Sequence, residues 1–142
     1  MSPIATSTED YDPLYLQGIA YFNACEFFEA HEVWEDLWKS YSGDLRLFYK
    51  GLIQAAVALH HFGNGNIRGA RKVHRSSRGY LEQYGPRCLG LNVEKFLAEF
   101  DACFADVAAS QEEFPQIKID PELIPEIMLD PPVELPAVDV EG

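Results

Sequence analysis

The chain has 142 residues, of which 47% are hydrophobic and 13% aromatic, so it can bury a sizeable core and is not intrinsically disordered as a whole. Its formal net charge of −12 argues against a general nucleic-acid binder, because most of its field repels phosphate. No apolar run approaches the roughly 20 residues that a membrane-spanning helix needs.

The N-terminal segment contains neither a basic residue nor an apolar signal core, so we expect a cytoplasmic protein with a flexible leader over residues 1–11. Asp12 and the proline after it form the N-cap and the first position of a predicted helix. Asn23 is followed three residues later by Glu26, which resembles a capping box and predicts the start of a second helix.

Three more helices are expected further along the chain. Asp44 is the predicted N-cap of the third helix, which Gly63 ends. Asn66 is the predicted N-cap of the fourth, which runs to about Tyr84, and Asn92 that of the fifth. No strand or internal repeat is evident. The pattern therefore predicts an all-α fold, a compact bundle of about five antiparallel helices.

The C-terminal segment differs in composition. Residues 115–142 hold six of the nine prolines and seven acids against one lysine, a net charge of −6. Proline at this density does not support a helix or a central strand, so the tail is either disordered or laid along the bundle through its spaced aliphatics, which favour partial docking. The predicted organisation is a leader over 1–11, a helical bundle domain over 12–114 and an extended acidic tail over 115–142.

The stretch FFEAHEVWEDLW at residues 27–38 carries the most unusual pattern in the chain. Its HEVWE segment departs from the zinc-protease motif H-E-x-x-H at the fifth position, Glu35, and is thus HExxE-like. On a helix, His31 and Glu35 lie one turn apart at an edge of the apolar face, whereas Glu32 points away from that edge.

The third helix is apolar almost all round and carries Gln54 inside the segment GLIQAAVAL. A buried glutamine that loses a hydrogen bond destabilises the fold by about 1–3 kcal/mol unless a partner meets it. The edge of the second helix that carries His31 and Glu35 is the nearest source, and His61 lies on the same side of the third helix as Gln54. We therefore predict a buried polar cluster of His31, Glu35, Gln54 and His61.

Two blocks, FNACEFFEAHEVWEDLW at residues 22–38 and GLIQAAVALHHFGNGNIRGA at residues 51–70, resemble the signature blocks of the bacterial family called domain of unknown function 309 (DUF309). The combination is specific, because a His-Glu-x-Trp-Glu helix followed by a Gly-Leu-Ile-Gln helix and a Gly-Asn turn is not generic. The resemblance implies a small all-helical bundle and no particular activity, and the acidic tail lies outside it. The family-motif positions are His31, Glu32, Trp34, Glu35, Gln54, His61, Gly65, Asn66, Gly69 and Ala70.

The cluster allows two interpretations. His31 and Glu35 could present a nitrogen and an oxygen to a divalent metal ion, with His61 as third ligand and Glu32 in reserve as a base, which would make a metal-dependent hydrolase. In the other interpretation Glu35 only accepts a hydrogen bond from the imidazole and fixes its tautomer.

The fourth helix carries five cations and no acid between residues 68 and 78. They fall within one sector, and the ordinary account of such a sector is a solvated outer face. The sharper hypothesis is an anion-binding surface for a phosphorylated ligand, an acidic partner or the protein's own tail, of which we rank the tail first because an intramolecular contact needs no partner. We call this surface the basic strip; it consists of Arg68, Arg71, Lys72, Arg75 and Arg78.

Two functions remain open from the sequence. A small binding or interaction module is favoured, because the cluster supplies few converging catalytic groups and no nucleophile elbow occurs. The alternative is the metal-dependent hydrolase that uses His31, Glu35 and His61. An aromatic face on the first or fifth helix could also form a homodimer.

Overall fold

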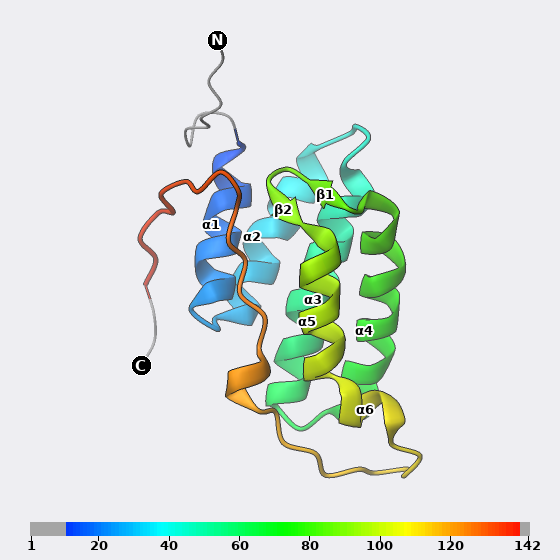
Figure 1. The fold of residues 1–142 in the computed structure, drawn as a ribbon. Helices are drawn as coiled ribbons and strands as arrows, with labels where there is room; N and C mark the ends of the chain where they lie inside the picture. The colour runs from blue at the N-terminus through cyan, green and yellow to red at the C-terminus, as the bar shows by residue number, and fades with distance from the viewer. Residues whose placement is uncertain (1–10, 140–142) are drawn as a thin grey trace.

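The computed structural model describes residues 11–139 and shows a compact all-α bundle, which confirms the predicted fold class (Figure 1). The predicted leader lies outside the described residues apart from Tyr11. None of the helices in the described range is long and apolar enough to cross a membrane. The helices are α1 (Pro13–Asn23), α2 (Phe27–Ser40), α3 (Arg46–Gly63), α4 (Ile67–Leu81), α5 (Val93–Cys103) and the short α6 (Ala105–Ala109).

Three of the predicted helix starts are confirmed by their capping hydrogen bonds. Asp12, Asn66 and Asn92 each accept a hydrogen bond from a backbone N–H in the first turn of their helix, at 2.8, 3.0 and 3.0 Å. These bonds satisfy N–H groups that have no partner within the helix itself.

Two predicted caps are wrong. Helix α2 begins at Phe27 and no side chain caps it, because the Asn23 amide instead binds the backbone of Ile127 in the tail, donating at 2.9 Å and accepting at 2.8 Å. Helix α3 begins at Arg46, two residues beyond Asp44, and also lacks a side-chain cap. Asn23 is the last residue of α1, and Asp44 lies in the turn that precedes α3.

A small hairpin between α4 and α5 corrects the expectation of no strand. Strand β1 (Arg87–Cys88) pairs antiparallel with β2 (Leu91–Asn92). The turn between them uses Gly90 at a φ of 78°, a conformation that glycine adopts without steric penalty. Helix α4 also ends at Leu81, earlier than predicted, and continues as a 3₁₀ turn, η2 (Glu82–Tyr84).

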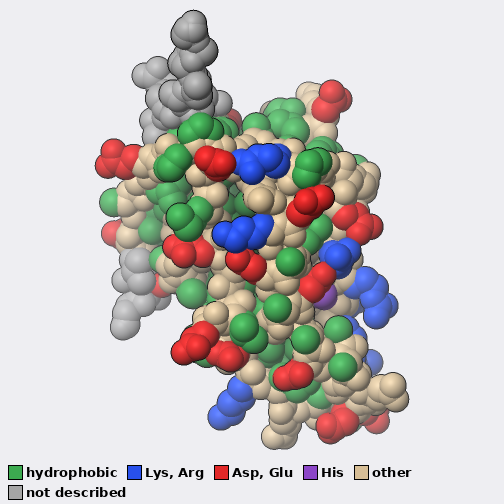
Figure 2. Space-filling model, viewed as in Figure 1, with side chains coloured by type: hydrophobic (Ala, Val, Ile, Leu, Met, Phe, Trp, Pro, Cys, Tyr) green, Lys and Arg blue, Asp and Glu red, His purple; other side chains and the backbone are tan. Residues whose placement is uncertain are grey.

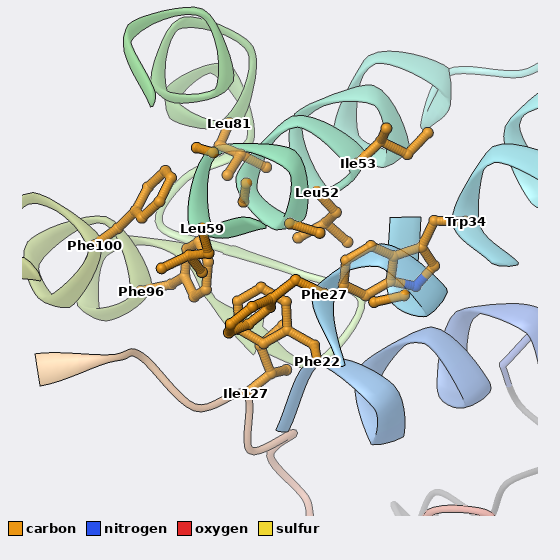
Figure 3. Close-up of a cluster of buried hydrophobic side chains, with 14 of the residues drawn as sticks. Phe22, Phe27, Trp34, Leu52, Ile53, Leu59, Leu81, Phe96, Phe100 and Ile127 are labelled. Carbon is orange, nitrogen blue, oxygen red and sulfur yellow. The ribbon is translucent and has the colours of Figure 1, made fainter. Parts of the chain in front are cut away.

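Helix α3 lies at the centre of the bundle, packed against α2 and α4, and α1 packs against α2. Each large apolar side chain that this core buries contributes about 1.5–3 kcal/mol of stability. Figure 3 shows that α1 to α5 and the tail all supply side chains to one cluster. Members from these six segments are Phe22, Trp34, Leu52, Leu81, Phe96 and Ile127.

The first two helices approach closely at a glycine. The Trp34 ring is fully buried against Gly18, where an added Cβ would collide with the indole. The indole N–H donates to the Tyr15 carbonyl oxygen at 3.2 Å, so its polar atom is satisfied inside the core. Trp34 is thus a structural residue.

A second glycine sets the spacing between α3 and α4. A Cβ on Gly51 would lie 2.7 Å from two carbons of the Leu81 side chain. The buried Ser77 hydroxyl donates to the Gly51 carbonyl oxygen at 2.7 Å, which ties the two helices together at the same point. The glycine of the GLIQ segment therefore serves helix packing.

The tail lies along the bundle between α1 and α5 (Figure 1). Within residues 111–139 its regular structure is the 3₁₀ turn η3 (Pro121–Leu123). Ile127 and Leu129 are 1% and 6% exposed, so they belong to the core of the bundle. Farther along the tail, Asp130 forms an ion pair with Arg87, in which Oδ2 and Nη2 lie 3.2 Å apart. The domain boundary at 114/115 remains a prediction.

Asn23→Ala should loosen the tail, because both hydrogen bonds to Ile127 are lost and its buried backbone groups are left without partners. We expect a loss of about 1–3 kcal/mol in the free energy of unfolding and faster amide exchange over residues 125–130. Asn64→Ala is the matched control, since that exposed amide contacts only the His60 ring at 3.2 Å. Equal effects of the two variants would contradict the assigned role of Asn23.

Gly51→Ala should destabilise the fold by about 1–3 kcal/mol through overpacking against Leu81. Gly79→Ala on α4 is the control: no atom lies within 4 Å of its added Cβ, so it should stabilise the helix by about 0.5–1 kcal/mol. Urea denaturation of both variants measures the difference. Equal stabilities would show that α3 and α4 do not need the glycine at their contact.

Candidate ligand-binding face

Helices α2 and α3 run antiparallel in a register that two contacts fix. The Phe28 and His60 ring centroids lie 5.6 Å apart, and Lys50 Nζ lies 4.6 Å from the centroid of the Trp38 ring. The two contacts are separated by the same number of positions on each helix, from 28 to 38 on α2 and from 50 to 60 on α3. Because both helices rise by the same distance per residue, the positions between the contacts pair in order.

This register places His31 at the level of Val57 and Glu35 at the level of Ile53, one position before Gln54. The residues concerned recur every three or four positions on each helix, so they form two neighbouring stripes, and all of them are half-buried. We call this surface the α2–α3 face; it consists of His31, Glu35 and Trp38 on α2 and of Arg46, Lys50, Gln54, Val57 and His61 on α3.

The four residues of the predicted polar cluster all belong to the α2–α3 face, but within residues 11–139 no hydrogen bond joins them. His31 Nδ1 lies 3.0 Å from the carbonyl oxygen of Phe28, to which it donates in the Nδ1–H tautomer. The Asn66 amide lies 3.3 Å from His61 Nδ1. The side chains thus share a face, and a hydrogen-bonded cluster remains a prediction.

The proposed metal ligands are not gathered. Among the described residues no group of three or more histidine, cysteine or acidic side chains is arranged to hold a metal ion. His61 lies one turn beyond the level of His31, and Glu32 is exposed. The geometry therefore gives the metal-dependent hydrolase no ligand set from His31, Glu35 and His61.

Two polar atoms on this face are buried without a partner. Trp38 Nε1, a donor, and Gln54 Oε1, an acceptor, make no hydrogen bond with the described residues. Such an atom destabilises a fold by about 1–3 kcal/mol and calls for an explanation in water, ligand or strain.

Two cations lie against the ring of Trp38. Arg46 Cζ is 3.9 Å and Lys50 Nζ 4.6 Å from the ring centroid. Each such contact contributes about 0.5–2 kcal/mol. Neither cation forms an ion pair with an acid in the described part of the chain, so both charges are available to a ligand.

The basic strip divides into two groups. Arg71 donates to the Val107 carbonyl oxygen at 3.0 Å, and Arg78 donates to both Asp101 oxygens at 3.0 and 2.8 Å. These two side chains tie α4 to α5 and α6. The other three are exposed, without an ion pair to any described residue; they are Arg68, Lys72 and Arg75.

In the part of the chain that the structure describes, the tail lies away from the basic strip, for which it was our first-ranked occupant. No hydrogen bond or ion pair joins residues 115–139 to the strip in the part of the chain that the structure describes. The tail instead buries Ile127 and Leu129 between α1 and α5. Burial of two such side chains outweighs exposed ion pairs, which contribute at most about 1 kcal/mol each.

One buried polar group escaped the sequence analysis. His74 is 8% exposed, stacks on the Phe104 ring with centroids 4.6 Å apart, and contacts Asp101 Oδ1 through Nε2 at 3.0 Å. Burial lowers the pKa of His74, and the hydrogen bond to Asp101 opposes that shift. Its helical spacing from the buried residues Ala70 and Ser77 could have identified His74 as an inward-facing residue. The basic residues beside it in the sequence obscured that pattern.

Comparison with known proteins confirms the family resemblance. Residues 15–73 match the model of the family described as "Domain of unknown function (DUF309)". An uncharacterized protein of Aquifex aeolicus is 29% identical over 92 residues, which cover 64% of this chain and 26% of the relative. The uncharacterized protein YpuF of Bacillus subtilis is 35% identical over 74 residues, 51% of this chain and 42% of the relative. The chain thus spans less than half the length of either curated relative.

His74 should make stability depend on pH. Because its folded pKa lies below the ordinary value of 6.5, the unfolded state binds more protons below that pH. The free energy of unfolding should therefore fall as the pH drops from about 7.5 to about 5.5, and less so in His74→Phe, whose ring still packs against Phe104. Urea titrations at each pH measure both slopes. Equal slopes would contradict the assignment.

Proposed function

We propose that the domain whose residues 15–73 match the DUF309 family model is a binding module, with its ligand on the α2–α3 face. Every residue of that face falls inside the matched range. The observation that carries the proposal is the pair of buried atoms without a partner, the Trp38 N–H and the Gln54 side-chain oxygen.

The two atoms require complementary groups on a ligand. Trp38 needs an acceptor and Gln54 needs a donor, and a ligand that provides both removes two unfavourable burial terms at once. Arg46 and Lys50 both lie against the indole ring, so a ligand that reaches the buried Nε1 also comes close to their charges.

The charges of the α2–α3 face favour an anion. Arg46 and Lys50 are half-buried and lack acidic partners, and hydrogen bonds from such cations to carboxylate or phosphate are stronger than neutral ones. The Gln54 side-chain oxygen is an acceptor, so it selects a ligand group that has an N–H or O–H. The proposed ligand therefore carries an anionic oxygen and a hydrogen-bond donor in one small molecule or peptide terminus.

Titration followed by ¹H–¹⁵N NMR of the two indole N–H groups tests the proposal. The probes are free glutamate, inorganic phosphate and a deproteinised bacterial extract. We expect at least one probe to shift the Trp38 signal and to leave Trp34, whose N–H is bonded to Tyr15, unchanged. Trp38→Phe assigns the two signals.

Gln54→Leu is the matched variant, because it keeps the size of the side chain and removes the acceptor. Loss of one hydrogen bond should weaken the same titration about tenfold. The proposal is wrong if none of the three probes moves Trp38, or if Trp34 and Trp38 move together. An unchanged affinity in Gln54→Leu would remove Gln54 from the recognition face.

A further inference from the structure

Two surfaces of opposite charge flank α5. On one side, α4 carries the basic strip and is tied to α5 by the contacts of Arg78 and His74 with Asp101. On the other side, the acidic tail passes next to α5, and η3 packs against it. Figure 1 shows α5 between the tail and α4.

The cations of the basic strip that face solvent have no ion-pair partner among residues 11–139. Arg71 and Arg78 hold α4 in place, while Arg68, Lys72 and Arg75 make no ion pair with the described residues. The tail cannot supply one without releasing its anchors, since Asn23 binds Ile127 and the Gly90 carbonyl oxygen accepts from the Asp130 N–H at 2.9 Å.

Two acids of the tail are equally open. Glu122 and Glu126 are exposed and form no ion pair with the described residues. They lie on either side of a hollow that α5 and the tail line together, with Lys95 and Ala102 from α5 and Met128 from the tail. In Figure 2 several Lys and Arg side chains lie along the right edge of this view, others lie nearer its middle and lower left, and acidic side chains are spread over the face.

Between the two charged flanks, α5 and the tail expose small and apolar side chains beside the Lys95–Glu99 ion pair of α5. Ala98 and Ala102 are exposed on α5 and leave its backbone open to close approach. Met128 is 70% exposed and Leu123 is 43% exposed beside them. Exposed apolar side chains with charged residues around them are the usual layout of an association surface.

We propose that a second copy of this chain covers the face formed by α5 and the tail, with a two-fold axis parallel to α5. Rotation about that axis exchanges the flanks, so the basic strip of each copy meets the acidic tail of the other, and the α5 helices meet at the centre. The contact is made twice and closes on itself, as isologous dimers do.

The charges identify the partner as a second copy. The tail is acidic at a net −6 over residues 115–142, and the strip is the one long basic stretch of a chain with a net charge of −12. Helix α4 and the tail both run antiparallel to α5, so the order of their charges is preserved across the axis (Figure 1). Exposed ion pairs are screened by salt, so association should weaken as ionic strength rises.

Sedimentation velocity on the full chain and two charge-reversed variants tests this arrangement. The strip variant combines Arg68→Glu, Lys72→Glu and Arg75→Glu; the tail variant combines Glu122→Lys and Glu126→Lys. We expect the wild type to dimerise at about 50 mM salt and to dissociate at about 500 mM. Each variant alone should be monomeric, because its strip and tail then carry charges of the same sign.

Sedimentation of a mixture of the two variants is the decisive experiment. Each variant then offers the charge that the other lacks, so both contacts reform and an equimolar mixture should sediment as a heterodimer. Circular dichroism and thermal melts establish that both variants are folded. A wild type that stays monomeric at low salt, a dimer that persists in either variant alone, or a mixture that stays monomeric would each overturn the proposal.

Discussion

The contact between α3 and α4 at Gly51 decides which side of the central helix stays open. The Ser77 hydroxyl binds the backbone there, and Leu81 fills the space that a side chain would need. With α4 held on one side and α2 on the other, the stripe of α3 between them keeps polar residues at half burial. Gln54 therefore loses water at its oxygen without gaining a protein partner. The α2–α3 face is a consequence of this packing.

Much of the fold follows from the sequence because it rests on short-range chemistry. Asp12, Asn66 and Asn92 cap their own helices within three residues, so the pattern alone identifies them. Asn23 carries the same signal, yet its partner lies 104 residues away and the cap does not form. Short-range rules contain no term for a tail that returns to the bundle, and for this reason the role of Asn23 could not be predicted.

The candidate site shows the same division. Helical spacing places His31 with Glu35 and Gln54 with His61, since that is a property of each helix by itself. Helical spacing gives no distances between α2 and α3. The sequence prediction therefore placed the proposed metal ligands closer together than the structure does. The partner of His74, Asp101, comes from a helix that starts 26 positions after α4 begins, and no local pattern links them.

The two proposals use different sides of the molecule and different physics. The α2–α3 face lies within the DUF309 match and combines buried hydrogen-bonding atoms with cations against an aromatic ring. The surface flanking α5 depends on exposed charge, and its acidic half lies in the tail beyond that match. A dimer formed through α5 leaves the α2–α3 face free, so ligand binding and self-association are compatible.

Proton exchange of the two indole N–H groups measures the central claim most directly. The Trp34 proton is held by a carbonyl oxygen in the core, whereas the Trp38 proton has no acceptor among the described residues. In the absence of added ligand, Trp38 should exchange with solvent much faster than Trp34. A Trp38 proton protected as strongly as that of Trp34 would mean that the protein already satisfies it, and the face would then have no unmet need for a ligand.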